Sequence, residues 1–259
     1  METIDVQRTG DVIIATIDHP RSEVNAVDAV LHREFGELFS MLKHESAARA
    51  VVLTGSGSAF SAGGDMAWFP ELRAPDALHS LRREAKQIVW DLLDVEIPIV
   101  CGLNGSAAGL AASIALLCDV VVMADRAKIV DPHVLVGLVA GDGGAAIWPL
   151  LVGPLVAKRH LMLGDPVDAA TAERWGVAAE VCPSAEVGER ARAWADRLAA
   201  GAPLAVQGTK IAVNQQIKRA LIDSFDLSTA LEMPCFNSDD HAEAVSAFVE
   251  KRTPRFFGR

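Results

Sequence analysis

A chain of 259 residues with a hydrophobic content of 51% is long enough to bury one large domain core. Its formal net charge of −10 argues against nucleic acid or an anionic membrane surface as a partner. The four cysteines lack the close spacing of a disulfide framework or a zinc site, and the first residues lack a basic segment followed by an apolar one, so we expect a cytoplasmic protein.

The first predicted strand covers residues 12–18, an apolar run rich in β-branched side chains. Residues 19–26 form a loop, and the residues after it predict an amphipathic helix because the apolar ones recur at helical spacing. These residues are Val30, Leu31, Phe35, Leu38 and Leu42. A second predicted strand, residues 51–55, is again apolar and ends at a glycine, which indicates a buried strand that runs into a turn.

A glycine turn follows this second strand, with Ala62, Gly63, Gly64 and Asp65 in sequence, and the residues beyond it have a helical pattern. Asp65 suits the positive end of a helix and is expected to cap its first N–H groups. Glycine lets a ligand approach the backbone closely, and an N–H group aimed into a cleft stabilises an oxygen that becomes negative during a reaction. The turn therefore predicts one half of an oxyanion hole, with the amide of Gly64 as the donor.

Residues 97–118 hold a second turn of the same kind, because an apolar strand runs into a glycine-rich turn at 104–109 and then into a small-residue apolar helix. Amides at Gly64 and Leu110 would give a hole with two donors, and the alternative is that both are tight turns without a ligand. The stretch carries no charged residue and is long enough for a membrane helix. Pro98 and the glycines interrupt it, however, so we expect two buried elements and no membrane span.

Further along, residues 75–95 predict a helix, and strand–strand–helix units repeat to about residue 190. Beyond a break at residues 199–203, the chain is predicted to be helical to residue 250, with interruptions near Asp223 and Pro234. We therefore expect a core at residues 1–198 and a C-terminal helical subdomain at residues 199–259, packed on the core or on a neighbouring subunit.

Several of these motifs resemble, in the expected order, the signature series of the enoyl-CoA hydratase/isomerase (crotonase) family. They are residues 60–65 (FSAGGD), 98–100 (PIV), 104–109 (NGSAAG), 118–119 (CD), 141–144 (GDGG), 175–178 (WGVA) and 248–256 (FVEKRTPRF). The resemblance covers nearly the whole chain. It implies an α/β fold, a crotonase-type spiral of ββα units with a C-terminal helical region, assembled as a homotrimer or a dimer of trimers.

The resemblance also implies an acyl-CoA thioester as the substrate and an enolate held in the two-amide hole. Coenzyme A would enter as part of the substrate, and no other cofactor and no metal is implied. The implied substrate-binding positions are Val24 and Ala26 beside the pantetheine arm, Ala62 and Asp65 in the first glycine turn, and Phe256, whose counterpart in relatives touches the adenine of CoA bound to a neighbouring subunit.

The sequence departs from this family at the two glutamates that its hydratases use for proton transfer. The matching positions hold Ser113, which can hold water but has no useful pKa, and His133, which titrates near neutrality. Asp142 lies in a glycine-rich turn that faces the same cleft in relatives, so its carboxylate is a candidate partner for the imidazole. This His–Asp pair resembles the oxo-camphor hydrolase branch, which opens β-diketones without CoA. We expect Asp131 to be a turn residue, and the other histidines, His32 among them, to be surface or core residues.

Three functions stay open on this basis. The first is an enoyl-CoA hydratase/isomerase-family enzyme that acts on an acyl-CoA thioester with His133 and Asp142 as an altered acid–base pair. The second is a CoA-independent C–C hydrolase of β-dicarbonyl compounds that uses the same pair. The third is a catalytically silent acyl-CoA-binding or scaffold protein. The intact first glycine turn favours a CoA thioester as the substrate. The sequence does not indicate the length of the acyl chain or the pathway.

Overall fold

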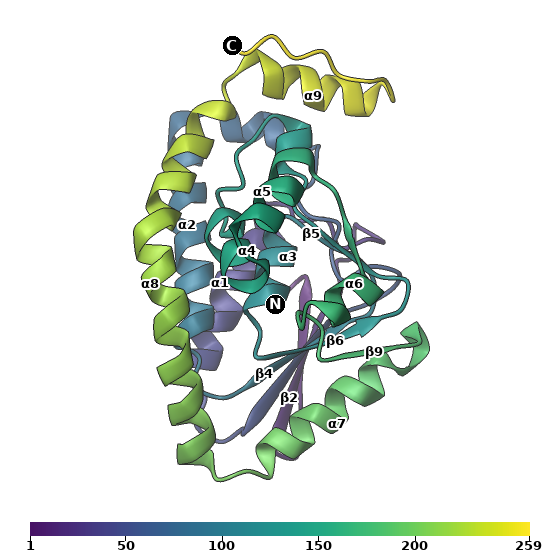
Figure 1. Cartoon of the computed structure of the whole chain (residues 1–259), viewed down its shortest axis with the longest axis vertical. Coiled ribbons are helices and arrows are strands. Elements are labelled where there is room, and N and C mark those ends of the chain that lie inside the picture. Colours follow the sequence, from purple (N-terminus) through teal and green to yellow (C-terminus); the bar gives the residue numbers. More distant parts are fainter.

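A six-stranded sheet lies at the centre of the computed structural model, which describes residues 1–259 (Figure 1). Its strands in spatial order are β1 (Ile4–Thr9), β2 (Val12–Ile17), β3 (Ala50–Gly55), β4 (Ile99–Leu103), β6 (Val120–Ala124) and β9 (Glu180–Cys182). β1 and β2 pair antiparallel, and the other neighbours pair parallel. Every residue of β4 is buried, as expected for a parallel strand that is covered on both faces.

A second, three-stranded sheet is formed by short strands, β5 (Ala107–Ala108), β7 (Lys128–Val130) and β8 (Val167–Asp168). The helices are α1 (Ala29–Lys43), α2 (Pro75–Asp94), α3 (Leu110–Leu117), α4 (Gly144–Val152), α5 (Pro154–Leu163), α6 (Ala169–Arg174), α7 (Val187–Ala199), α8 (Pro203–Cys235) and α9 (Asp239–Val249). Three 3₁₀ helices, η1 (Phe69–Arg73), η2 (His133–Val136) and η3 (Ser184–Glu186), complete the elements. Strand–strand–helix units such as β1–β2–α1 and β4–β5–α3 recur, which confirms the predicted α/β spiral.

The N-terminal edge of the sheet differs from the prediction, because β1 precedes the strand that we expected to be the first. β1 is largely exposed and polar, so it lacks the apolar run that marks a buried strand. Gly10, with a φ of 64°, makes the tight turn that folds β1 back onto β2.

The first glycine turn also continues differently, since no α-helix begins at Asp65. The Asp65 carboxylate instead accepts a hydrogen bond of 2.9 Å from the amide of Ala67 and closes a local turn that leads into η1. Proline cannot donate an N–H to a helix interior, so Pro70 and Pro75 confine this segment to a 3₁₀ turn before α2 begins at Pro75 itself. The prediction of a helix cap at Asp65 is therefore wrong.

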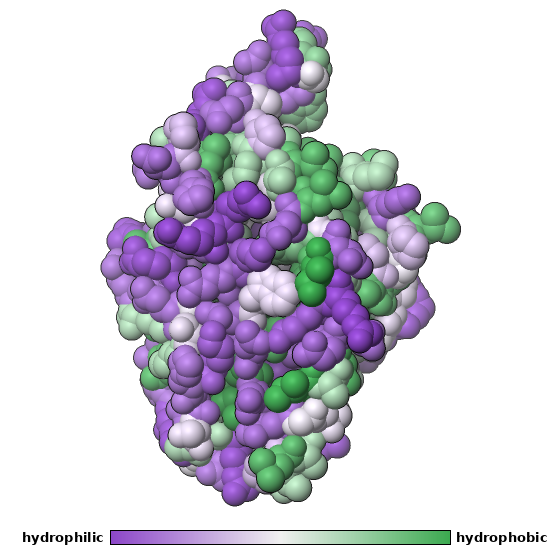
Figure 2. Space-filling view, turned by 90° about the vertical axis from the view of Figure 1, so that its left-hand side faces the viewer, coloured by the Kyte–Doolittle hydropathy of each residue, from purple (hydrophilic) through white to green (hydrophobic).

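In the C-terminal region, α8 runs unbroken along α2 on one side of the molecule and also contacts α4 (Figure 1). The predicted break near Asp223 is wrong because Leu221 and Phe225, one turn apart, are both buried and hold the helix against the core. The expected break near Pro234 is confirmed, since α8 ends one residue later. The face with α8 is mainly hydrophilic, with apolar side chains gathered below the lobe at the top (Figure 2).

The uncharged stretch at residues 97–118 forms β4, β5 and α3 around a turn, as predicted. None of the helices combines the length and the apolar character needed to cross a membrane.

Candidate active site

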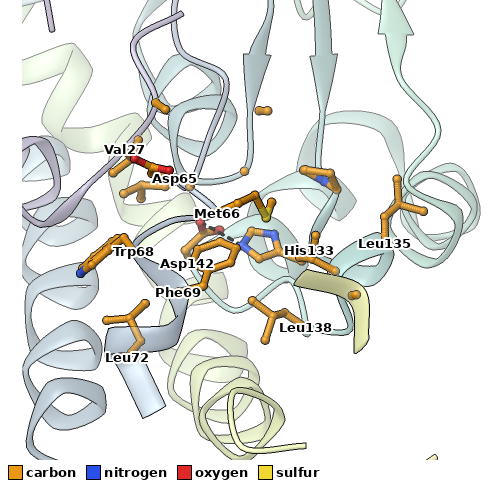
Figure 3. A pocket seen from close by; sticks show the side chains of 18 of the residues that line it. Val27, Asp65, Met66, Trp68, Phe69, Leu72, His133, Leu135, Leu138 and Asp142 are labelled. Carbon is orange, nitrogen blue, oxygen red and sulfur yellow. Dashed lines mark ion pairs between the residues drawn. The ribbon is translucent and has the colours of Figure 1, made fainter. Parts of the chain in front are cut away.

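A cavity of about 690 Å³ lies among the two glycine turns, η1, α2, η2 and the C-terminal helices, and most of its lining residues are hydrophobic (Figure 3). Five lining residues carry candidate chemistry: Gly64, Leu110, His133, Asp142 and Glu232. Four of them were expected from the sequence, and Glu232 was not.

The two glycine turns meet in the structure although more than forty residues separate them in sequence. The amide of Ala108 donates to the carbonyl of Ser61 at 3.1 Å, and Ser61 forms a parallel bridge with Ala107. Gly63 adopts a φ of 81° and lies so close to the Ala108 carbonyl that a side chain at position 63 would crowd it. Backbone hydrogen bonds therefore join the two turns into one rigid wall of the cavity.

The amides of Gly64 and Leu110 both lie in this wall, and neither donates a hydrogen bond to another group of the protein. Leu110 is the first residue of α3, where a helix leaves its N–H groups unpaired. The residues on either side of Gly64 pair with Val27, and the Gly64 amide does not. The Val27 amide donates to the Gly63 carbonyl, and the Asp65 amide donates to the Val27 carbonyl. Two unpaired donors in a largely apolar cavity are suited to bind an oxygen atom that gains negative charge.

His133 begins η2 and lies between two carboxylates. Its Nδ1 is 2.6 Å from Oδ1 of Asp131, and its Nε2 is 3.3 Å from Oδ2 of Asp142 (Figure 3). Burial by itself would lower the pKa of His133, but the charges of Asp142 and Asp131 and their hydrogen bonds outweigh it and raise the pKa well above the usual value. The imidazole is therefore held as a cation at neutral pH.

Glu232, near the end of α8, places Oε1 3.9 Å from Nε2 of His133. Burial, together with the negative charges of Asp142 and Asp131, raises the pKa of Glu232 to about 8 against the opposing charge of His133. Glu232 is therefore mostly protonated at pH 7 and carries a proton that it can donate.

The glycine-rich turn at residues 141–144 makes room for these buried carboxyl groups. A side chain at position 141 would overlap the carboxyl group of Glu232, and one at position 144 would overlap that of Asp131. The hydroxyl of Thr229 donates to the Gly141 carbonyl at 3.0 Å and ties the turn to α8. The glycines are thus required by the close approach of acidic side chains from two other parts of the chain.

The cluster of Asp131, His133 and Asp142 also has the composition of a metal site. The two carboxylates, however, lie on opposite ring nitrogens of His133, and a metal ion bound to one nitrogen would leave the other carboxylate on the far side of the ring. A doubly protonated imidazole that donates to both carboxylates fits this arrangement better.

The other predicted site residues are placed as follows. Ser113 is buried on α3 behind the Gly143 backbone and does not line the cavity, and its hydroxyl has no hydrogen-bond partner. Val24, Ala26, Ala62 and Asp65 line the cavity, and Val24 and Ala62 are exposed at its mouth. Phe256 lies outside this cavity, next to a smaller hollow near the C-terminus.

Sequence reasoning missed three residues around the cavity. Asp131 is a buried partner of His133 and not a simple turn residue, a role that its position two residues before His133 could have indicated. His32 lines the cavity wall, and Glu232 lies in a long helix without a local motif. Only the fold brings these two to the site.

Known proteins are similar to this chain over nearly its whole length. The family model for enoyl-CoA hydratase/isomerase matches residues 7–259. The chain is 30% identical to the carnitinyl-CoA dehydratase of Proteus mirabilis, over 100% of this chain and 99% of the relative, and 30% identical to the probable enoyl-CoA hydratase echA8 of Mycobacterium bovis with the same coverage.

Solved structures show the same similarity. An enoyl-CoA hydratase/isomerase from Mycobacterium paratuberculosis superposes with a TM-score of 0.91 at 36% identity, over 95% of this chain and 98% of that one. A β-diketone hydrolase from the cyanobacterium Anabaena superposes with a TM-score of 0.85 at 28% identity, over 91% of this chain and 94% of that one. The chain belongs to the enoyl-CoA hydratase/isomerase family.

Proposed function

We propose that this protein acts on acyl-CoA thioesters by removing a proton from the carbon next to the thioester carbonyl. The carbonyl oxygen becomes negative in that step, and the unpaired amides of Gly64 and Leu110 support a site that binds it. This pair of free donors is the observation that carries the proposal, since loss of one such donor costs about 3–4 kcal/mol of barrier.

Asp142 and Glu232 take the parts of base and acid in this proposal. The raised pKa of Glu232 makes it the proton donor of the two carboxyl groups near neutral pH. His133 lies against both groups through Nε2, which is 3.3 Å from Asp142 and 3.9 Å from Glu232. The pair Asp142 and Glu232 would thus replace the two glutamates that positions 113 and 133 lack.

The reaction that best suits this pair is the addition of water to, or its removal from, an acyl-CoA. Relatives of this chain carry the names enoyl-CoA hydratase and carnitinyl-CoA dehydratase, which describe these two directions. In hydration, Asp142 would deprotonate the water that adds to the β-carbon, and Glu232 would protonate the α-carbon of the enolate. In the reverse direction and in α-hydrogen exchange, the carboxylate form of Glu232 would take the α-proton, and in dehydration Asp142 would return a proton to the leaving hydroxyl.

The proposal is tested by the exchange of α-hydrogens in a saturated acyl-CoA. We expect the protein to incorporate deuterium from D₂O into butyryl-CoA, read by mass spectrometry, and to hydrate crotonyl-CoA. Deuterium exchange without hydration would support enolate formation and would indicate double-bond isomerisation as the reaction. CoA-ester binding with neither reaction would contradict the proposal and indicate a silent binding protein.

A second candidate function is favoured by the carboxylate–imidazole cluster itself. Asp131, His133 and Asp142 form a chain of hydrogen-bonding groups suited to activate water for attack on a carbonyl carbon, and the Anabaena neighbour is named a β-diketone hydrolase. Cleavage of a cyclic β-diketone without any affinity for CoA esters would establish this function in place of the first.

We also propose a cytoplasmic homotrimer or dimer of trimers. Apolar side chains exposed on the outer helices, Leu155, Met162 and Phe248, support further subunit contacts, and Phe256, 49% exposed, is free to reach a neighbour. Light scattering coupled to size exclusion should give a mass of three or six protomers, and a monomer at micromolar concentration would contradict this assembly.

A further inference from the structure

The lining of the cavity has exposed and buried parts. Val24 and Ala62 are exposed at its mouth, whereas the lining residues Val27, Leu72 and Ala85 are buried. His32 from α1 belongs to the buried set, with only 3% of its surface exposed. A thioester held at the glycine turns with its CoA arm in the mouth would therefore extend its acyl chain toward His32.

The ring of His32 is held by two contacts. Its Nδ1 lies 3.0 Å from Oε2 of Glu84 on α2, and its ring centroid is 5.6 Å from that of Trp68. The hydrogen bond from His32 lowers the pKa of Glu84, so this carboxylate is ionised and can only accept. Nδ1 therefore carries the proton that is shared with Glu84.

The other ring nitrogen, Nε2, has no hydrogen-bond partner in the protein. Glu84 borders a separate outer hollow of about 310 Å³ and not the cavity, so the Nδ1 edge of the ring faces outward. His32 lines both this hollow and the cavity, and because its Nδ1 edge is on the Glu84 side, we infer that the opposite edge, with Nε2, borders the cavity. Nε2 is thus an unpaired hydrogen-bonding atom, and a hydroxyl group, which both donates and accepts, can pair with it.

We propose that His32 forms a polar subsite in the buried part of the cavity, where Nε2 hydrogen-bonds a hydroxyl group on the acyl chain of the substrate. Trp68, which packs on His32, lies on the opposite side of the cavity from His133, so the subsite is separate from the acid–base groups (Figure 3). The inference rests on the proposed function, because it takes an acyl-CoA as the occupant.

Two other kinds of chain fit this subsite less well. A plain alkyl chain would bury Nε2 without a partner, which is costly for a polar atom. A carboxylate would meet the negative charge of Glu84 behind the ring and that of Asp65 in the cavity wall. The subsite therefore selects an uncharged hydrogen-bonding group.

Calorimetric titration tests the subsite with three series of saturated CoA esters of increasing length, whose chain ends carry a methyl, a hydroxyl or a carboxylate group. At one chain length we expect the hydroxyl ester to bind about tenfold more tightly than its methyl counterpart. His32→Leu, which removes the nitrogens, should abolish this preference, because the methyl ester gains affinity once no polar atom is buried against it and the hydroxyl ester loses its partner.

Glu84→Gln provides an independent test at a partly exposed position, should His32→Leu fail to fold. The substitution removes the negative charge behind the ring, and the Gln amide can donate to Nδ1 so that Nε2 carries the proton; the carboxylate ester should therefore gain affinity, whereas the hydroxyl ester, which can also accept, should keep its preference over the methyl ester. A thermal melt of each variant controls for unfolding.

The outcomes separate the two proposals. Binding of the esters with no hydroxyl preference, or with one that survives His32→Leu, overturns the subsite and leaves the proposed function standing. If no CoA ester binds at all, the proposed function is wrong and the subsite proposal falls with it.

Discussion

Oε1 of Glu232 lies 3.9 Å from Nε2 of His133, although the two residues come from different elements nearly a hundred positions apart. One side of this contact is a histidine held as a cation, and the other is a carboxyl group held neutral by burial. The long helix α8 thus supplies the site with an acid that the glycine turns and η2 lack.

Replacement of Glu232 tests its role as that acid. Glu232→Gln preserves the shape and the neutral state but cannot transfer a proton, so turnover of enoyl-CoA should fall by about 10²–10⁴-fold. The affinity for CoA esters, measured by calorimetry, should change little because the amides of Gly64 and Leu110 are untouched. Undiminished turnover would remove Glu232 from the chemistry.

The same carboxyl group predicts how stability depends on pH. The pKa of Glu232 rises from 4.5 in the unfolded chain to about 8 in the folded protein, so the folded protein binds an extra proton between these values. Its contribution to the free energy of unfolding is full below pH 4.5 and is lost as the pH rises to about 8, by up to about 1.4 kcal/mol per pH unit. The free energy of unfolding, measured by urea titration at several pH values, should depend less steeply on pH in Glu232→Gln than in the unsubstituted protein. An equal pH dependence in the two proteins would contradict the raised pKa.

Asp131 is predicted to act on His133 and not on the substrate, because it does not line the cavity. Burial opposes the charged ring and the carboxylates favour it, so Asp131→Asn should lower the pKa of His133, measured by NMR of the ring. The matched control is Asp226→Asn, which removes an exposed carboxylate paired with Lys86 and should leave this titration unchanged. A His133 pKa that is the same in all three proteins would refute the assignment.

The oxyanion hole is tested by removing one amide. Leu110 is the first residue of α3, where proline is tolerated, so Leu110→Pro deletes the N–H with limited damage to the helix. Leu110→Ala keeps the N–H and loses the same side-chain contacts. We expect Leu110→Pro to exchange α-hydrogens about 10²–10³-fold more slowly than Leu110→Ala. Equal exchange rates would exclude this amide.

The glycine-rich turn predicts a stability difference between two Gly→Ala substitutions. A methyl group at position 141 would overlap the Glu232 carboxyl group, so Gly141→Ala should destabilise the protein by about 1–3 kcal/mol. Gly208, on the same helix as Glu232, has open space around it, and Gly208→Ala should be neutral or stabilise by up to about 1 kcal/mol. Thermal melts of both variants check this, and equal melting temperatures would count against the packing described.

Local patterns were sufficient to predict much of the fold. The sequence of residues 97–118 predicts a strand, a turn and a helix, because an apolar run, a group of glycines and a run of small apolar residues follow one another. The same reasoning failed at Asp65 and Asp223, where local propensity competes with prolines or with the packing of Leu221 and Phe225. The predicted positions of Gly64, Leu110, His133 and Asp142 all line one cavity.

The sequence by itself determined the family, the two glycine turns and the absence of the usual glutamates at positions 113 and 133. Only the tertiary structure decided what stands in their place, because the pKa of a carboxyl group depends on burial and on charges contributed by distant parts of the chain. Nothing near Glu232 in sequence distinguishes it from a surface residue of a helix. Its neutral state arises where α8 packs against the turn at Gly141 and closes the cavity over His133.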